Sequence, residues 1–98
     1  MACKVILSPR AIQDLREIVR YISFDNPQAA AKFGYTLIDA ALSLGSLPER
    51  GRFVPELADG ITREILCGAY RIVYRLSSDQ KAVWVSRFWH AARGTPEI

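Results

Sequence analysis

Cysteine and histidine are scarce in this chain, and their scarcity excludes several kinds of site. The 98 residues include two cysteines, Cys3 and Cys67, and a single histidine, His90. Structural zinc sites use about four Cys or His ligands at characteristic spacings, and small disulfide scaffolds use several cysteine pairs. The sequence therefore predicts neither a metal cluster nor a disulfide framework. We expect both cysteines to be small buried side chains of a reduced, cytoplasmic protein.

Long apolar runs are also missing. No stretch approaches the ~18 apolar residues of a transmembrane helix, and the N-terminal MACKVILSPR lacks the apolar region of a signal peptide. The glycines match neither a phosphate-binding loop nor a dinucleotide fingerprint, and no serine lies in the Gly-x-Ser-x-Gly turn of a hydrolase. We expect one globular domain over residues 1–98, with no cofactor and no membrane contact.

Positive charge is concentrated in the second half of the chain. Residues 1–49 hold five basic and five acidic side chains, whereas residues 50–98 hold eight basic and five acidic ones, so the second half carries the net charge of +3. Ten of the thirteen basic residues are arginine, whose planar guanidinium group suits forked binding of carboxylates and phosphates. Two interpretations stay open here, namely an acidic or phosphate-bearing partner and an ordinary solvated surface.

Two consecutive helices are predicted in the first half of the chain. Ser8-Pro9 and Asn26-Pro27 each combine an N-capping side chain with a proline at the first helical position. Apolar residues recur at helical spacing after each cap, and the second helix should end near Leu44. Asp14 is expected on the opposite, charged face of the first helix. Because the connection between the helices is short, they should be antiparallel neighbours.

Short runs of β-branched and aromatic residues predict four strands, at residues 3–7, 62–67, 70–76 and 82–88. A connector rich in glycine and proline, residues 45–60, precedes the last three. The order β-α-α-β-β-β predicts an α+β fold in which an N-terminal helical hairpin packs on a small, mainly antiparallel sheet. The hairpin should cover one face of this sheet, which leaves the other face for solvent or a partner.

Four arginines lie inside the predicted strands, at Arg63, Arg71, Arg75 and Arg87. Strand alternation puts Arg71 and Arg75 on one face with Val73, opposite residues 70, 72, 74 and 76. They are either solvated side chains or a cationic surface for phosphates or an acidic peptide. A cationic surface would also stabilise the transition state of RNA cleavage by charge alone, without a metal. The strand aromatics, Trp84 among them, are expected mainly in the core.

Five segments in a fixed order resemble one protein family. They are LSPRAIQDLREIVRYI at 7–22, DNPQAAAKF at 25–33, LPERGRFVPEL at 47–57, REILCGAYRIVYRL at 63–76 and VSRFWHAAR at 85–93. Together they are similar to the RelE/ParE superfamily of bacterial toxins from type II toxin–antitoxin modules, over nearly the whole chain. The fold of that family is the β-α-α-β-β-β arrangement. The NPQAAAKF, PERGRFVPEL and HAAR segments are most similar to the ParE-like branch.

The resemblance implies a function by binding. ParE-like toxins trap the cleaved-DNA complex of DNA gyrase without catalysing a reaction, so no residue need be catalytic and no metal or cofactor is implied. Arg87, His90 and Arg93 are then the predicted target contacts. RelE-like members instead cut mRNA on the ribosome, and Arg63 and Arg87 stand where those nucleases have catalytic arginines, so an endoribonuclease is the alternative. A small non-toxic RNA-binding module is a third hypothesis, and it predicts a steep salt dependence of RNA binding.

The resemblance also implies a cognate, ParD-like antitoxin with a DNA-binding domain and an acidic neutralising tail. The tail would lie in an apolar groove beside the helical hairpin, rimmed by arginines, and Arg63, Arg71 and Arg75 are its predicted contacts. The two chains are expected to form a hetero-oligomer. The present chain has no helix-turn-helix signal, so no direct sequence-specific DNA binding is expected of it.

Overall fold

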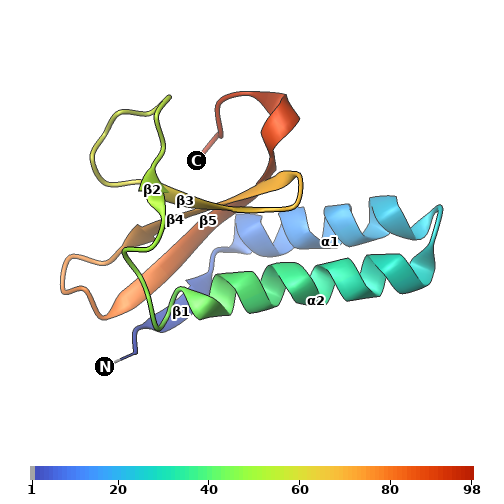
Figure 1. Ribbon diagram of the computed structural model, residues 1–98, viewed down its shortest axis with the longest axis horizontal. Coiled ribbons are helices and arrows are strands. Elements are labelled where there is room, and N and C mark those ends of the chain that lie inside the picture. Colours follow the sequence, from blue (N-terminus) through green and yellow to red (C-terminus); the bar gives the residue numbers. More distant parts are fainter. Residues whose placement is uncertain (1) are drawn as a thin grey trace.

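One strand, two consecutive helices and then four strands follow one another along the chain, and the five strands form a single mixed sheet (Figure 1). The computed structural model describes residues 2–98, in the order β1 (Lys4–Leu7), α1 (Pro9–Ser23), α2 (Pro27–Ser43), β2 (Arg52–Phe53), β3 (Arg63–Cys67), β4 (Tyr70–Leu76), β5 (Ala82–His90) and a short 3-10 helix η1 (Ala91–Arg93). The strand order is β1-β5-β4-β3-β2, with β1 parallel to β5 and the other pairs antiparallel. The predicted α+β fold is confirmed. The short β2 is additional, and β5 runs two residues beyond its predicted end.

Both helices begin at the predicted caps. The Ser8 hydroxyl accepts a hydrogen bond from the Ala11 amide at 3.0 Å, and the Asn26 side chain accepts one from the Ala29 amide at 3.0 Å. A proline follows each cap at the first helical position. Caps of this kind stabilise a helix by about 1 kcal/mol each. The second helix ends at Ser43, one residue before its predicted end.

The helical hairpin covers one face of the sheet and supplies the main core. An added Cβ at Gly34 of α2 would lie 2.9 Å from a methyl group of Val19 in α1, so the glycine permits a close approach of the two helices. Fully buried apolar side chains pack beneath the hairpin, namely Leu37, Ala41, Leu44, Ile72, Tyr74, Val83 and Val85. Burying a Val, Leu or Ile side chain contributes roughly 1.5–3 kcal/mol, so this layer drives folding.

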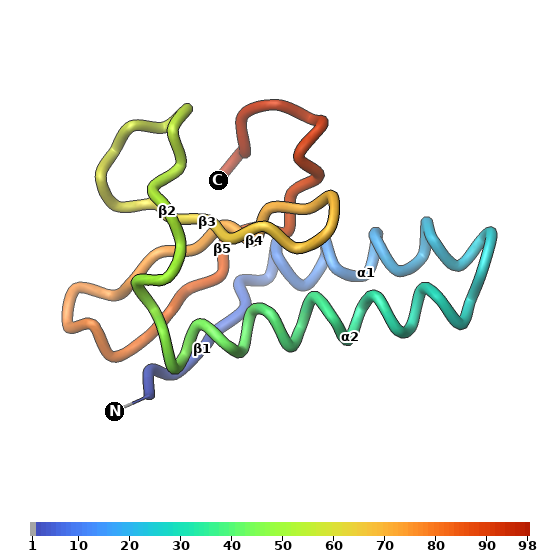
Figure 2. Tube along the Cα trace, viewed as in Figure 1, coloured from blue at the N-terminus to red at the C-terminus, as the bar shows by residue number. Residues whose placement is uncertain are grey.

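The chain itself covers part of the second face of the sheet, so the prediction that this face is left for solvent or a partner was wrong for that part. The connector and the C-terminal tail fold over it, on the side away from the helices (Figure 2). Val54 and Leu57 of the connector pack there against Val73 and Trp89, in a second, smaller core. Periodicity within a strand shows which residues share a face, but it does not show which distant segment returns to cover that face.

Tyr74 fastens the start of the connector to the sheet. Its hydroxyl accepts a hydrogen bond from the Gly51 amide at 2.9 Å and donates one to the Pro48 carbonyl at 2.8 Å. An added Cβ at Gly51 would lie only 2.5 Å from that hydroxyl oxygen, so a larger residue cannot take this place without movement.

Residues 86–90 of β5 have a strand neighbour on the β4 side only, because β1 ends before β5 does, so their other side forms an edge of the sheet. Side chains near the start of α1 cover this edge. The Ser8 hydroxyl donates to the Ser86 carbonyl at 3.0 Å, and the Asp14 carboxylate accepts a hydrogen bond from the Phe88 amide at 3.1 Å. Open strand edges invite pairing with other chains, and these contacts occupy groups through which such pairing would occur.

Two smaller predictions hold only in part. Among the strand aromatics, Tyr74, Phe88 and Trp89 are buried as predicted, whereas Trp84 is 46% exposed, because it lies on the part of the second sheet face that the connector and tail do not cover. Cys3 and Cys67 are half-buried free thiols rather than fully buried ones. Among residues 2–98, no helix is long and apolar enough to cross a membrane.

Candidate functional site

A cleft of about 310 Å³ opens between α1 and the edge of β5. It is lined by Asp14, Glu17, Ile18 and Tyr21 of α1 and by Tyr70, Phe88, His90 and Arg93 of the strands and η1. Two of the three predicted target contacts, His90 and Arg93, therefore come together at one site.

His90 ends β5 and caps η1. Its Nδ1 accepts a hydrogen bond from the Ala92 amide at 3.1 Å, which assigns the proton of the neutral ring to Nε2. The ring meets Tyr70 edge to face, with ring centroids 5.0 Å apart at an interplanar angle of 81°. These contacts fix the orientation of the ring, and Nε2–H is the donor that it can offer to a bound molecule.

Arg93 lies on η1 at the rim of the cleft, where its side chain is exposed. Its guanidinium carbon is 4.1 Å from the centre of the Trp89 ring, a cation–π contact of about 0.5–1 kcal/mol at an exposed site. A cation–π contact does not need the guanidinium N–H groups as hydrogen-bond donors to an oxygen, so these groups remain suited to a carboxylate or a phosphate.

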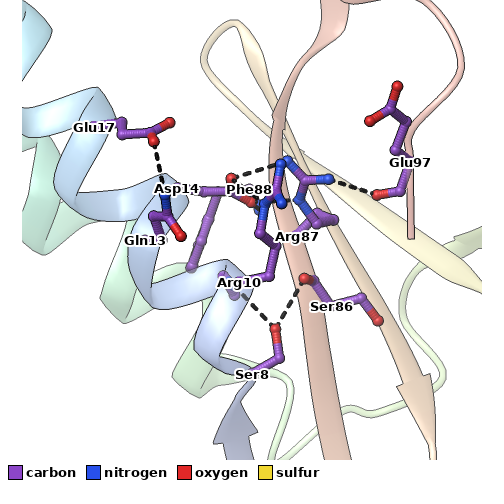
Figure 3. A network of polar contacts seen from close by, with 10 residues as sticks. Ser8, Arg10, Gln13, Asp14, Glu17, Ser86, Arg87, Phe88 and Glu97 are labelled. Carbon is purple, nitrogen blue, oxygen red and sulfur yellow. Dashed lines mark hydrogen bonds and ion pairs between the residues drawn. The ribbon is translucent and has the colours of Figure 1, made fainter.

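Arg87, the third predicted target contact, does not line the cleft, and its side chain points instead toward Asp14 and Glu97 (Figure 3). Nε and one terminal nitrogen donate to the two oxygens of Asp14 at 2.7 and 3.0 Å, and the other terminal nitrogen donates to the Glu97 carbonyl at 2.9 Å. The side chains of Arg87 and Asp14 are only 4% and 6% exposed. Hydrogen bonding to Asp14 raises the pKa of Arg87. The expectation that strand arginines face solvent is therefore wrong here.

Asp14 is a key residue that the sequence analysis placed on the wrong face. It follows the buried Ala11 by three residues and precedes the buried Ile18 by four, so helical spacing sets it on the buried side of α1. Its charge suggested a solvated position. Because a carboxylate on the buried side of a helix needs a partner, this position in the sequence could have predicted a buried ion pair for Asp14.

A second buried carboxylate, Glu64 on β3, holds two arginines on the face away from the helices. Arg52 donates to one of its oxygens at 2.8 Å and Arg71 to the other at 3.3 Å. Arg71 also donates two hydrogen bonds to Glu56, at 3.0 and 2.7 Å. The bonds with Glu56 raise the pKa of Arg71, and the same bonds lower the pKa of Glu56. Arg71 is thus held by partners within the chain.

Arg75 and Arg63, the other predicted antitoxin contacts, also have internal partners. Arg75 Nε donates to the Thr62 hydroxyl at 2.8 Å, and its guanidinium lies 3.5 Å from Asp59. Arg63 donates to the Gly51 carbonyl at 2.8 Å. Register places Arg63 on the helix-facing side of the sheet and Arg71 and Arg75 on the opposite side, so the three do not form one patch.

An apolar groove of about 260 Å³ lies between α1 and α2. Its lining is Leu15, Val19, Ala31, Gly34, Tyr35 and Ile38, and contains no arginine, unlike the predicted rim. Several large apolar side chains of the hairpin are exposed, including Tyr35 at 69% and Leu42 at 55%. An apolar groove with exposed apolar side chains on the same helical hairpin is typical of a site of protein–protein contact.

The side chains that line the cleft include hydrogen-bond donors and charged groups that suit the binding of another molecule. His90 supplies a ring N–H, Arg93 a guanidinium group and Glu17 a carboxylate, beside the aromatic ring of Tyr21. Among residues 2–98, no group of three or more His, Cys, Asp and Glu side chains is placed to hold a metal ion.

Comparison with known sequences gives consistent matches over almost the whole chain. A family model described as the ParE toxin of the type II toxin–antitoxin system, parDE, matches residues 5–94. Two curated relatives from Caulobacter vibrioides, Toxin RelE1 and Toxin RelE2, are each 37% identical over 91 residues. These matches cover 92% of the present chain and 95% and 97% of the relatives.

Two solved structures share the fold. One is described as the chromosomal ParDE TA system from P. aeruginosa, with a TM-score of 0.75, 17% identity, and coverage of 91% of this chain and 96% of that chain. The other is the toxin–antitoxin complex RelBE2 from Mycobacterium tuberculosis, with a TM-score of 0.66, 25% identity, and coverage of 92% and 99%. The first likeness, at 17% identity, concerns the fold alone.

Proposed function

Because the chain belongs to the ParE toxin family of type II toxin–antitoxin systems, we propose that it poisons DNA gyrase by trapping the cleaved-DNA complex of that enzyme. In this proposal the chain acts by binding and catalyses no reaction of its own.

The main support for the proposal is that the arginines that a RelE-like nuclease would use are hydrogen-bonded to groups within the chain. A metal-free ribonuclease needs cations that reach the scissile phosphate. Arg87 instead gives three hydrogen bonds to Asp14 and to the Glu97 carbonyl, and its side chain is 4% exposed. Arg63 donates to the carbonyls of Glu49 and Gly51. These contacts favour a toxin that binds its target over one that cleaves RNA.

Target contact is proposed for the cleft between α1 and β5, through His90 and Arg93. Both side chains reach the cleft, and Arg93 is exposed at its rim. An N–H donor beside a guanidinium group fits the carboxylates and main-chain carbonyls of a protein surface.

The partner is proposed to be an antitoxin whose helix covers the apolar groove between α1 and α2. Two structures that share this fold are described as a ParDE TA system and a RelBE2 toxin–antitoxin complex. An amphipathic helix is the usual ligand of an apolar groove between helices. Contact of the antitoxin with Arg63, Arg71 and Arg75 stays a prediction, as does an acidic tail on that partner.

A supercoiling assay with purified chain, gyrase, ATP and relaxed plasmid tests the target. We expect loss of supercoiling together with accumulation of linear, gyrase-linked DNA. The double variant His90→Ala/Arg93→Ala should lose this activity, whereas Arg16→Ala, which removes an exposed arginine on α1, should retain it. Undisturbed supercoiling by a chain that still arrests growth would exclude gyrase as the target.

An endoribonuclease is the second candidate, because the two curated relatives at 37% identity are named Toxin RelE1 and Toxin RelE2. A translation extract with a defined mRNA separates the two functions. Cleavage of that mRNA by the wild-type chain, abolished by Arg63→Ala, would favour the nuclease, and an intact message would favour gyrase.

A further inference from the structure

We propose that Arg87, Trp89 and Gly94 form a bracket that holds the C-terminal tail, residues 91–98, against the sheet, and that this bracket positions the target-contacting side chains of the cleft. The bracket itself follows from contacts within the chain. Its role in target contact rests on the function proposed above.

Side chains of β5 tie the tail down at two points. Arg87 donates to the Glu97 carbonyl at 2.9 Å, and the Trp89 indole N–H donates to the Gly94 carbonyl at 3.0 Å. The tail accordingly folds back over the sheet instead of extending into solvent (Figure 2). Two hydrogen bonds to main-chain carbonyls hold the path of the tail without depending on the identity of its side chains.

Arg87 is an internal tie in this arrangement and does not contact the target. Asp14 occupies two of its donor groups and Glu97 a third, and its side chain is 4% exposed (Figure 3). A target molecule could reach the guanidinium group only by displacing Asp14 or the tail. Loss of function on replacing Arg87 would therefore report a change of position in the residues that do reach the cleft.

Trp89 connects this tie to the cleft. The centre of its ring is 4.9 Å from the guanidinium carbon of Arg87 and 4.1 Å from the guanidinium carbon of Arg93. The ring is buried to 2% exposure against Val54 and Val73, so its own position is fixed by the second core. Because Arg93 belongs to the tail, release of the tail from Trp89 would move Arg93 away from the ring on which it rests at the rim of the cleft.

Gly94 allows the chain to reverse toward Arg87. Its backbone has φ +80° and ψ −141°, a conformation that glycine adopts freely and that other residues rarely adopt. An added Cβ would meet no atom within 4 Å, so Gly94→Ala disfavours the turn without removing or crowding any contact. Gly60 in the connector also has a positive φ, +67°, and equally open surroundings. Gly60→Ala is therefore a matched control.

The bracket is tested first by hydrogen exchange of the tryptophan indole N–H groups in the full chain, followed by NMR. In the wild type we expect slow exchange for Trp89, whose N–H is bonded to Gly94, and fast exchange for the 46% exposed Trp84. Gly94→Ala should accelerate Trp89 exchange by about tenfold or more, the size expected of strain at a glycine conformation. Gly60→Ala should leave it at the wild-type rate.

The positioning role is tested by gyrase inhibition with the same proteins and with Arg87→Lys. Lysine keeps the positive charge beside Asp14, but its single ammonium group cannot reproduce the forked geometry that also reaches Glu97. Gly94→Ala and Arg87→Lys should both accelerate Trp89 exchange and raise the concentration for half-inhibition by about tenfold or more. Gly60→Ala should inhibit as the wild type does.

Three results would overturn the proposal. Unchanged Trp89 exchange in Gly94→Ala would mean that the turn does not hold the tail. Accelerated exchange with full gyrase inhibition would mean that tail position is irrelevant to the target. Loss of inhibition in Arg87→Lys with unchanged exchange would mean that Arg87 contacts the target directly. If the wild type fails to inhibit gyrase, the proposed function is wrong, and growth arrest by the same variants then decides whether the bracket positions the cleft.

Discussion

Two buried carboxylates, Asp14 and Glu64, hold arginines in different ways. Asp14 joins α1 to β5 across 73 residues of chain, and both members of its pair with Arg87 are almost fully buried. Glu64 is also fully buried, but Arg52 beside it is 61% exposed and Arg71 shares its charge with Glu56. The difference lies in what remains when the carboxylate is lost. Without Asp14, the buried guanidinium group of Arg87 would keep only the Glu97 carbonyl as a hydrogen-bond partner. Without Glu64, Arg52 is exposed enough to be hydrated, and Arg71 still has the carboxylate of Glu56.

The comparison shows that a cationic sequence pattern does not by itself define a binding surface. Arg87 and Arg71 looked alike as strand arginines, and both turn out to hold the fold together. The side chains that do reach a cleft, His90 and Arg93, lie where regular strand structure ends. Recognition in this molecule is therefore expected at the end of β5 rather than along the face of the sheet.

The largest expected effect is that of Asp14→Asn. We expect the free energy of unfolding to fall by about 3–5 kcal/mol, because the change leaves a buried guanidinium group without its counter-charge. Urea denaturation at neutral pH measures it. The double variant Asp14→Leu/Arg87→Met should recover a large part of the loss, since apolar replacement of a whole buried ion pair is often neutral. A loss below about 1 kcal/mol in Asp14→Asn would match an exposed pair and contradict the burial argument.

The same amide replacement at the other carboxylate, Glu64→Gln, should cost less, about 1–3 kcal/mol. Arg71 keeps its two hydrogen bonds to Glu56, and Arg52 is exposed enough to be hydrated. The same urea titration measures the change. A loss equal to that of Asp14→Asn would show that the remaining partners of these arginines do not matter.

A smaller effect is expected where Tyr74 holds the connector. Tyr74→Phe should lower the free energy of unfolding by about 1 kcal/mol, the usual net contribution of a hydrogen bond. Exchange of the Gly51 amide should become faster, because its acceptor is the Tyr74 hydroxyl. Tyr35→Phe, at a tyrosine that is 69% exposed, serves as the control and should change neither quantity. Unchanged Gly51 exchange in Tyr74→Phe would argue that other contacts hold the connector.

The smallest effect concerns acid stability at Asp59. Hydrogen bonds from the backbone amides of Thr62 and Ile61, and then from the Thr62 hydroxyl, lower the pKa of Asp59 from 3.8 to about 2. Because the folded-state pKa is depressed, the stabilisation is present above pH 3.8 and is lost as the pH falls toward 2. The unfolded chain binds more protons in this window, so stability rises with pH there. Asp59→Asn should flatten this rise of the free energy of unfolding with pH, measured by urea titrations at a series of pH values. An NMR titration of the Asp59 carboxyl group with a midpoint near 3.8 would contradict the lowered pKa.

Much of the fold was readable from local pattern. Ser8 and Asn26 cap helices where the sequence predicted them, and β4 alternates as expected, with Ile72 toward the helices and Val73 away. These features depend on residues within one helical turn or along one strand, so a window of sequence contains the information they need. The family resemblance, built on ordered segments of the same kind, was confirmed by the match over residues 5–94.

The sequence by itself determined the two helices, the four longer strands, their order and the gathering of positive charge in the second half of the chain. Only the tertiary structure decided which charged side chains form ion pairs and hydrogen bonds within the molecule. β1 stops short of the end of β5, which leaves that edge of the sheet open for Asp14 to meet Arg87, and the tail over the second sheet face is bonded to the Trp89 indole through the Gly94 carbonyl. Such contacts join residues that are far apart in the chain and whose side chains also suit a solvated surface. Burial, which only the assembled layers create, turns them from surface charges into structural ties.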